Sequence, residues 1–232
     1  MKKLLIIASF ILISISIFAQ EEPAFHFGVK ASPSLAWLRS DTKGYASDGS
    51  KFGFSYGLIT DFNFASKYAF STGIDITYRG GKFKTVQELK TKVNEDSVIS
   101  TSASYVLQYL EIPITLKLKT NEIGSVTYYV QVGVAPGINI RARKNYATNT
   151  QTFVLGAPTP KITNAEENKL DAQNEINSLS LSMIIGGGVE YTLSGQTVLV
   201  GGIQFNNGFL DVFDDTPKVN SNYLALTLGI LF

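Results

Sequence analysis

The sequence predicts an all-β fold: an eight-stranded antiparallel up-and-down transmembrane β-barrel over residues 20–232. Three observations carry this prediction. Eight segments alternate apolar and polar residues with a period of two, the connections between them alternate between long and short, and the chain ends on an apolar strand. With 17% charged and 12% aromatic residues, the chain is too polar for a bundle of membrane helices and too aromatic for a disordered protein.

Residues 1–19 have the layout of a secretory signal peptide. Two lysines, Lys2 and Lys3, precede an apolar run from Leu4 to Phe18, and Ala19 comes directly before Gln20. The run of about 15 apolar residues is shorter than the roughly 20 that a membrane-spanning helix needs. We therefore expect export through the general secretory route and cleavage after Ala19.

The eight expected strands follow in order along the mature chain. They are residues 25–37, 52–64, 68–79, 105–119, 126–141, 179–193, 196–209 and 223–232. Glycines at 186–188 and 201–202 interrupt the sixth and seventh strands, and they predict bends or bulges where a small barrel curves. Pro113 cannot donate to a β-ladder, which predicts a bulge or a partner-facing edge in the fourth strand.

The lengths of the connections predict the orientation. Residues 38–51, 80–104, 142–178 and 210–222 form long polar connections, which are expected as external loops with a short helix conceivable at 163–177. The short connections 65–67, 120–125 and 194–195 are expected as periplasmic turns. Outer-membrane barrels have this distribution of connections, whereas a soluble sandwich has no reason for it.

Alternation alone does not show which face points outward, because lipocalin-type barrels place their apolar face inside. Three features favour lipid outside: the leader, a charged polar face, and aromatic residues near the strand ends. The aromatic residues are Trp37, Phe52, Phe54, Tyr78 and Phe205 toward the long connections, and Phe64, Tyr68, Tyr128 and Tyr191 toward the short ones.

The polar face predicts a network of charges that fills the lumen. Its members are Lys30, Asp61, Asp75, Arg79, Glu111, Lys117, Arg141 and Glu190. Glu111 is expected to meet Lys30, Arg79, Lys117 or Arg141, and a structural lock is the main interpretation. A solute or proton path lined by these charges is the alternative, which the narrow lumen of eight strands disfavours.

The sequence predicts no catalytic site, cofactor or metal. There is no cysteine, and the single histidine, His26, is interpreted as a polar residue of the lumen or the periplasmic edge. Asp214 and Asp215 are interpreted as solvated loop carboxylates rather than as a cation site. Without Lys2 and Lys3 the chain has 18 basic against 19 acidic residues, so no field recruits nucleic acid.

Several stretches resemble a known family. The sequences "LQYLEIPITLKL", "FHFGVKASPSLAWL" and "LGILF", with "FAQ" at the leader end, resemble the PorT-like outer-membrane β-barrel proteins of Bacteroidota, over essentially the whole mature chain. The resemblance implies location and fold better than role, although some relatives serve in secretion or gliding machinery.

Together these observations predict a non-enzymatic protein integral to the outer membrane. It would anchor or present external loops, with unidentified envelope or secretion proteins as partners, and small-solute transport is the alternative. The terminal Phe232 resembles the signal that the barrel assembly machinery reads during biogenesis, so that machinery and outer-membrane lipid are the other expected partners.

Overall fold

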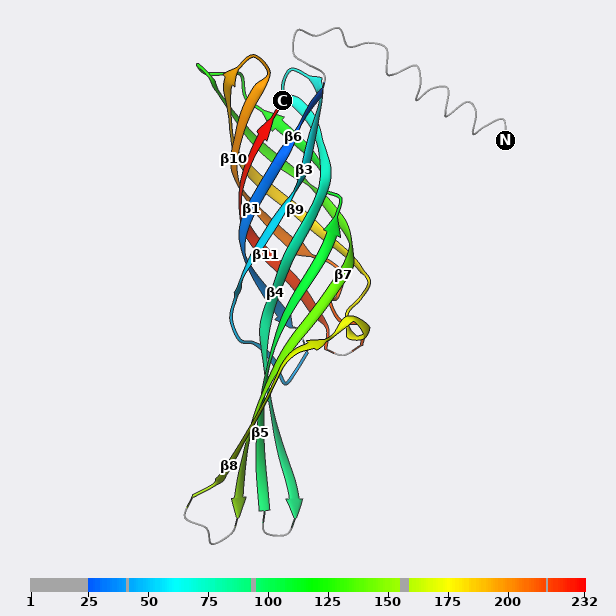
Figure 1. Ribbon diagram of the computed structural model, residues 1–232, viewed down its shortest axis with the longest axis vertical. Helices are drawn as coiled ribbons and strands as arrows, with labels where there is room; N and C mark the ends of the chain where they lie inside the picture. The colour runs from blue at the N-terminus through cyan, green and yellow to red at the C-terminus, as the bar shows by residue number, and fades with distance from the viewer. Residues whose placement is uncertain (1–24, 41, 93–94, 155–158, 216) are drawn as a thin grey trace, which may run out of the picture.

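The computed structural model of the protein describes residues 25–40, 42–92, 95–154, 159–215 and 217–232, and it is all β (Figure 1). The signal peptide expected at residues 1–19 lies outside the described residues. Among the residues that are described, no helix is long and apolar enough to cross a membrane.

The elements are numbered as in Figure 1. They are β1 (Phe25–Ser40), β2 (Tyr45–Ser47), β3 (Lys51–Ala65), β4 (Tyr68–Lys92), β5 (Glu95–Glu111), β6 (Ile114–Lys119), β7 (Val126–Val154), β8 (Lys161–Asp171), the 3-10 turn η2 (Gln173–Glu175), β9 (Leu179–Ser194), β10 (Thr197–Gly208) and β11 (Val219–Leu231).

The antiparallel pairings follow a ring. They run from β1 through β3, β4, the β5 and β6 pair, β7, β9, β10 and β11 back to β1. Phe27 and Phe232 complete the contact between the two ends, because each backbone N–H donates to the other residue's carbonyl, at 3.2 and 2.8 Å. A sheet that returns to its first strand leaves no open edge for hydrocarbon to cover. The predicted antiparallel barrel class is confirmed.

Pro113 separates β5 from β6, but neither predicted consequence is found. Glu111 pairs with Gly137 and Ile114 with Val134, so the register continues past the proline without a bulge. The segment is not an edge either, because β4 and β7 flank it on both sides. The missing N–H of Pro113 therefore only interrupts the ladder locally.

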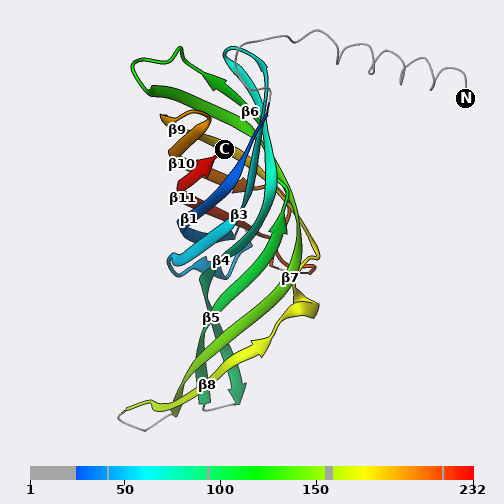
Figure 2. The same ribbon diagram turned by 45° about the horizontal axis from the view of Figure 1, so that its top comes forward.

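The largest difference from the sequence prediction lies in the long connections, which are mostly strand rather than loop. β4, β5 and β7 continue past the ring, and β8 pairs with β7 along Lys161–Asp171 (Figure 2). We call this projecting sheet of β4, β5, β7 and β8 the extension. The short helix conceivable at 163–177 is wrong, since β8 occupies most of that segment and only η2 is helical.

The strands of the extension are rich in Ser, Thr and β-branched residues, as in "SVISTSAS" at 97–104. β-Branched and hydroxyl side chains suit a sheet whose two faces meet water. The C-terminus lies at the opposite end of the ring (Figure 1).

The outward face of the ring is apolar and its inward face is polar. On β3, Phe54, Tyr56 and Leu58 are exposed, whereas Ser55 and Asp61 between and beyond them are buried. Aromatic residues pair near both ends of the outer face, with Trp37 stacked on Phe205 and Phe64 stacked on Tyr68, each at 6.2 Å between ring centroids. This is the arrangement of a barrel that meets lipid outside and keeps charge within.

Candidate functional site

The candidate site is the lumen, and its best-buried charge is Lys117. The side chain comes from β6 and is fully buried. Its Nζ lies 2.5 Å from Asp61 Oδ2 of β3 and 2.9 Å from Glu190 Oε1 of β9. One cation thus joins two acids from strands far apart around the ring. Lys119, two residues further along β6, balances the second acid with its Nζ 3.0 Å from Glu190 Oε2.

A second charged group lies closer to the extension. Arg79 Nη1 is 3.0 Å from Glu111 Oε1, and both side chains are almost completely buried. Glu111 Oε2 also accepts hydrogen bonds from Thr77 Oγ1 at 2.8 Å and from the Tyr223 hydroxyl at 3.4 Å. The Arg79 guanidinium stands 4.1 Å from the ring centroid of Tyr109. Of the partners expected for Glu111, the structure places Arg79 against it.

Lys30 and Asp75 form the third ion pair, at 2.7 Å. Asp75 lies directly opposite Glu111 in the β4–β5 register, so two acids are neighbours here. Each has its own cation, because Lys30 reaches Asp75 from β1 and Arg79 reaches Glu111 from β4. Like charges this close in a confined space need such compensation.

Arg141 does not join the lumen, and its predicted place there is wrong. Tyr109 pairs with Asn139 and Gln108 with Arg141, so Ile140 is an extra residue that forms a β-bulge. The bulge makes Ile140 and Arg141 both face outward, while Asn139 and Ala142 are buried. Among the described residues, the lumen pairs still match four cations with four acids, with Lys119 where Arg141 was expected.

The glycines of β9 and β10 create space for a lumen side chain. The β9–β10 and β7–β9 registers run without a shift through Gly188 and Gly202, so the bulges that were one alternative there are not found. A Cβ would lie 2.9 Å from the Tyr129 hydroxyl at Gly188 and 2.5 Å from it at Gly202. Tyr129 is buried against these glycines, and its ring centroid lies 4.8 Å from Lys117 Nζ.

Neutral polar residues fill the space between the ion pairs of Lys117 and the ion pair of Arg79 with Glu111. Gln131 donates to Gln204 at 3.2 Å, and Gln204 donates to Asn206 at 2.7 Å. The enclosed space that Gln131 and Gln204 help to line measures about 20 Å³. That volume holds about one water molecule, so side chains and not a water column fill this part of the lumen.

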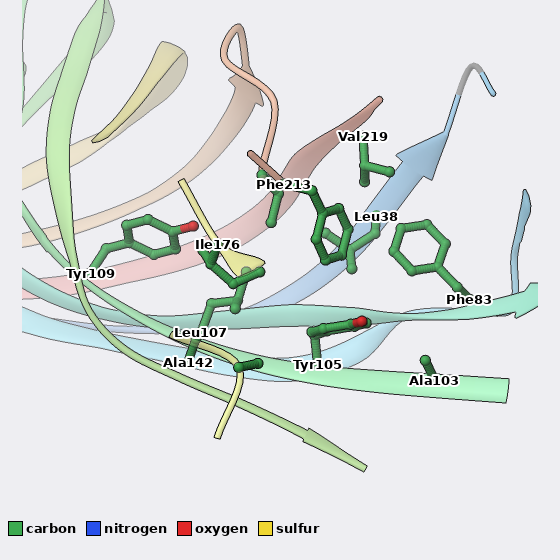
Figure 3. Packing of buried hydrophobic residues seen from close by; sticks show 12 residues of the cluster. Leu38, Phe83, Ala103, Tyr105, Leu107, Tyr109, Ala142, Ile176, Phe213 and Val219 are labelled. Atoms are coloured by element: carbon green, nitrogen blue, oxygen red, sulfur yellow. The ribbon is translucent and has the colours of Figure 1, made fainter. Parts of the chain in front are cut away.

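The end of the ring next to the extension is closed by an apolar plug that the sequence reasoning missed (Figure 3). Phe213, from the β10–β11 connection, packs against Tyr105 and Phe83, at 5.0 and 5.9 Å between ring centroids. Ile176, which follows η2, bridges to Phe213 through the backbone. The apolar pattern of "FLDVF" at 209–213 was the available signal.

The opposite end is open and polar. A cavity of about 300 Å³ is lined there by His26, Asn63, Lys119 and Glu190, among others. The His26 ring nitrogen Nδ1 lies 3.3 Å from Asn63 Nδ2. We call this cavity the vestibule, and we call Lys117, Asp61 and Glu190 the Lys117 group. The vestibule leads inward to the Lys117 group and ends there, because Lys117 contacts both acids.

The site offers ion pairing but little chemistry. Its acids and bases bond to one another, and within the described ranges no three His, Cys, Asp or Glu side chains gather to hold a metal ion. Asp214 and Asp215 are exposed beyond the plug. What the arrangement can do is hold the strands of the ring together and obstruct passage through it.

The fold and lumen define a class of membrane β-barrel with a filled interior. The outer membrane protein beta-barrel domain family matches residues 18–228, and the chain belongs to this family. A comparison with curated proteins finds no match.

Solved structures with similar folds include three outer-membrane proteins. Neisserial surface protein A is 13% identical with a TM-score of 0.43, over 90% of this chain and 98% of that one. Ail of Yersinia pestis is 13% identical with a TM-score of 0.35, over 90% and 100%. OprG from Pseudomonas aeruginosa is 12% identical with a TM-score of 0.38, over 90% and 95%.

Proposed function

We propose that the protein is a non-enzymatic, closed barrel of the outer membrane that anchors the extension and presents it outside the cell. The observation that carries the proposal is that the lumen is obstructed at two levels. Lys117 is fully buried between Asp61 and Glu190, and Phe213 plugs the end next to the extension. A barrel with such an interior serves through its surface and its projecting strands rather than through a pore.

The extension is suited to contact with other envelope components. Both of its outer strands, β4 beyond Thr85 and β8, have one side without a strand partner among the described pairings. Unpaired backbone groups of this kind can receive a strand from another chain. The partners remain those expected from the sequence: proteins of an envelope or secretion complex.

Small-solute transport is the second candidate, and the vestibule is the observation that favours it. Its volume of about 300 Å³ would admit a small solute from the turn end of the ring. The solute would then have to displace the Lys117 group to move further.

Single-channel recording in planar bilayers separates the two candidates. The anchor proposal expects no steady conductance from the wild type. It also expects none from Phe213→Ala, because the Lys117 group still closes the lumen after the plug is weakened. Steady, large conductance from the wild type would overturn the anchor proposal and favour transport.

The remaining parts of the proposal concern origin and biogenesis. We place the protein among PorT-like barrels of Bacteroidota, with export by a signal peptide cleaved after Ala19. Amino-terminal sequencing of the outer-membrane fraction tests this, since Met1 retained in an inner-membrane fraction would contradict it.

Phe232 is proposed as the residue that the barrel assembly machinery recognises. Its side chain is more than half exposed, while its backbone bonds to Phe27. Deleting Phe232 should therefore lower the amount of barrel inserted in cells far more than it lowers refolding in detergent. Equal insertion of both versions, measured as heat-modifiable barrel, would contradict the role.

A further inference from the structure

Four cations lie together on the outward face where the ring meets the extension. Lys82 and Lys84 of β4 continue the outward-facing row of Ile74, Ile76 and Tyr78, and both are exposed. Arg141 and Arg143 of β7 are also exposed, and they pair with Gln108 and Val106 of the intervening β5. We call Lys82, Lys84, Arg141 and Arg143 the basic patch.

The bulge at Ile140 is what brings Arg141 into this patch. Without the extra residue Arg141 would alternate into the lumen, as its position in the sequence suggests. Lys82 is level with Ser104 and Asn145, two pairs beyond Val106 and Arg143, so the patch reaches from β4 across β5 to β7. Within the described part of the chain, the ion pairs found involve none of the four residues of the patch.

The height of the basic patch matches the headgroup layer of a membrane. Tyr78 belongs to the outer-face aromatic group, stacked on Tyr56 at 6.5 Å between ring centroids. Arg141 lies opposite Gln108, which in turn lies opposite Tyr78. Lys82 lies four residues beyond Tyr78 along β4. For a strand that rises about 3.3 Å per residue at a tilt of about 40°, this places Lys82 roughly 10 Å beyond Tyr78 along the barrel axis.

An apolar groove lies on the same face, on the ring side of the patch. Its volume is about 440 Å³, and its lining includes Tyr56, Leu58, Ile74, Ile76 and Leu110 around Gly57. These side chains come from β3, β4 and β5, and the patch lies further along β4, where the ring meets the extension, and on β7 beside β5. A groove for hydrocarbon below a group of cations fits a lipid with an anionic head.

We infer that this face binds a phosphorylated glycolipid of the outer leaflet, of the lipid A type, with its phosphates on the basic patch and an acyl chain in the groove. The cations lie on two strands, β4 and β7, on either side of β5. This spread is wider than one phosphodiester needs and suits a head with phosphates on two sugars. The groove continues the lipid-facing surface of the ring, so the occupant is a membrane component. The inference rests on the proposed orientation, with the extension outside.

Carboxylates also occur nearby and limit the patch on its outer side. Asp48 and Glu166 line a hollow of about 230 Å³ together with Lys82, further from the ring than Arg143. Their position concentrates the positive charge of the patch on the ring side of Lys82, where Arg141 and Arg143 lie, and leaves Lys84 at the outer limit of the patch. Headgroup phosphates at the membrane surface would occupy this side.

The test compares the wild type with two variants that each lose four cations. The patch variant is K82Q/K84Q/R141Q/R143Q, and the matched control is K43Q/K67Q/K161Q/K169Q, whose lysines are exposed elsewhere. Each protein is purified as a folded, heat-modifiable barrel, and native mass spectrometry measures its binding of lipid A, of lipid A with the phosphates removed, and of phosphatidylglycerol.

The patch variant should bind lipid A at least about tenfold more weakly than the wild type, since each cation near an anionic surface contributes several-fold. The control should bind like the wild type, and dephosphorylated lipid A should bind the wild type as weakly as lipid A binds the patch variant. Equal binding by patch variant and control would overturn the inference. Phosphatidylglycerol binding as tightly as lipid A would overturn the choice of glycolipid.

The proposed function fails in a different experiment, so the two outcomes are distinguishable. Conductance in planar bilayers can overturn the closed barrel without affecting lipid A binding. External labelling of intact cells at cysteines introduced at Lys84 or Lys161 tests the orientation. Labelling only after the cells are opened would remove the premise of the lipid inference.

Discussion

The ring and the extension are built from the same strands but held together differently. β4, β5 and β7 pass through both regions with continuous antiparallel pairing. In the ring, one face of each strand carries buried ion pairs and the other carries exposed apolar residues. In the extension, β8 is exposed along almost its whole length. Backbone pairing therefore runs through both regions, while the buried ion pairs found among the described residues lie in the ring.

The largest expected effect comes from Lys117 in the ring. Lys117→Met would leave Asp61 and Glu190 with no cation between them, and breaking a buried pair in this way costs about 3–5 kcal/mol of the free energy of unfolding. Urea unfolding of the barrel in lipid vesicles measures the loss. Lys161→Met on exposed β8 is the matched change in the extension and should alter stability by less than about 0.5 kcal/mol. Similar losses for both variants would contradict the difference between the regions.

Glu111→Gln should have the next largest effect. The glutamine amide has the shape of the carboxylate but lacks the charge that balances Arg79. We therefore expect the free energy of unfolding to fall by about 2 kcal/mol, without an open pore. The same unfolding experiment and a conductance measurement check both parts. Glu166→Gln, on exposed β8, is the control in the extension. An unchanged unfolding midpoint for Glu111→Gln would mean that the ion pair does not stabilise the ring.

Two neighbouring glycines sharpen the comparison within the ring. A Cβ at Gly202 would lie 2.5 Å from the Tyr129 hydroxyl, whereas one at Gly201 would meet only a Val189 methyl at 4.0 Å. Gly202→Ala should therefore lower the free energy of unfolding by about 1–3 kcal/mol, and Gly201→Ala by less than about 0.5 kcal/mol. Equal effects, compared by urea unfolding, would show that the lumen is not closely packed around Tyr129.

Shortening the extension should have the smallest effect on the ring. Residues 86–100 and 149–164 can each be replaced by Asn-Gly, because Thr85 pairs with Thr101 and Thr148 with Ala165. We expect a change of less than about 1 kcal/mol in the unfolding of the ring, since long connections contribute little to it. A shortened protein that fails to form a heat-modifiable barrel would show that the extension is needed for folding.

The sequence was sufficient for the strands of the ring and for most of the side chains that share a face, because alternation with a period of two determines both. The charged residues and the aromatic residues near the strand ends then indicated which face points inward. The sequence predicted Lys117, Asp61 and Glu190 on the polar face, but not that they meet. That contact depends on how β3, β6 and β9 are staggered around the ring, which alternation does not specify. Lys119 lies two residues after Lys117 on the same strand and therefore shares its face, so it could have been included in the predicted lumen network on that ground.

Arg141 and the plug show where local pattern is insufficient. One extra residue, Ile140, reverses the face of Arg141, and no glycine or proline marks the bulge. Val212 and Phe213 were assigned to a polar connection, yet they are buried against residues from five different strands of the ring and its surroundings. Their burial depends on the connection folding back over the mouth of the ring, which only the tertiary structure determines.

The hydrogen bonds between Phe27 and Phe232 have a consequence for the order of folding. Gly28 pairs with Leu231, so nearly the whole described chain separates the two strands that complete the ring. Contacts between such distant parts of a chain form slowly, because the intervening segments must first be brought into place. Until β11 is in place, β1 has only one neighbour and the sheet has two open edges. Completion of the ring is therefore a late event, and a chain truncated before Val219 would remain exposed to pairing with other strands during its passage through the envelope.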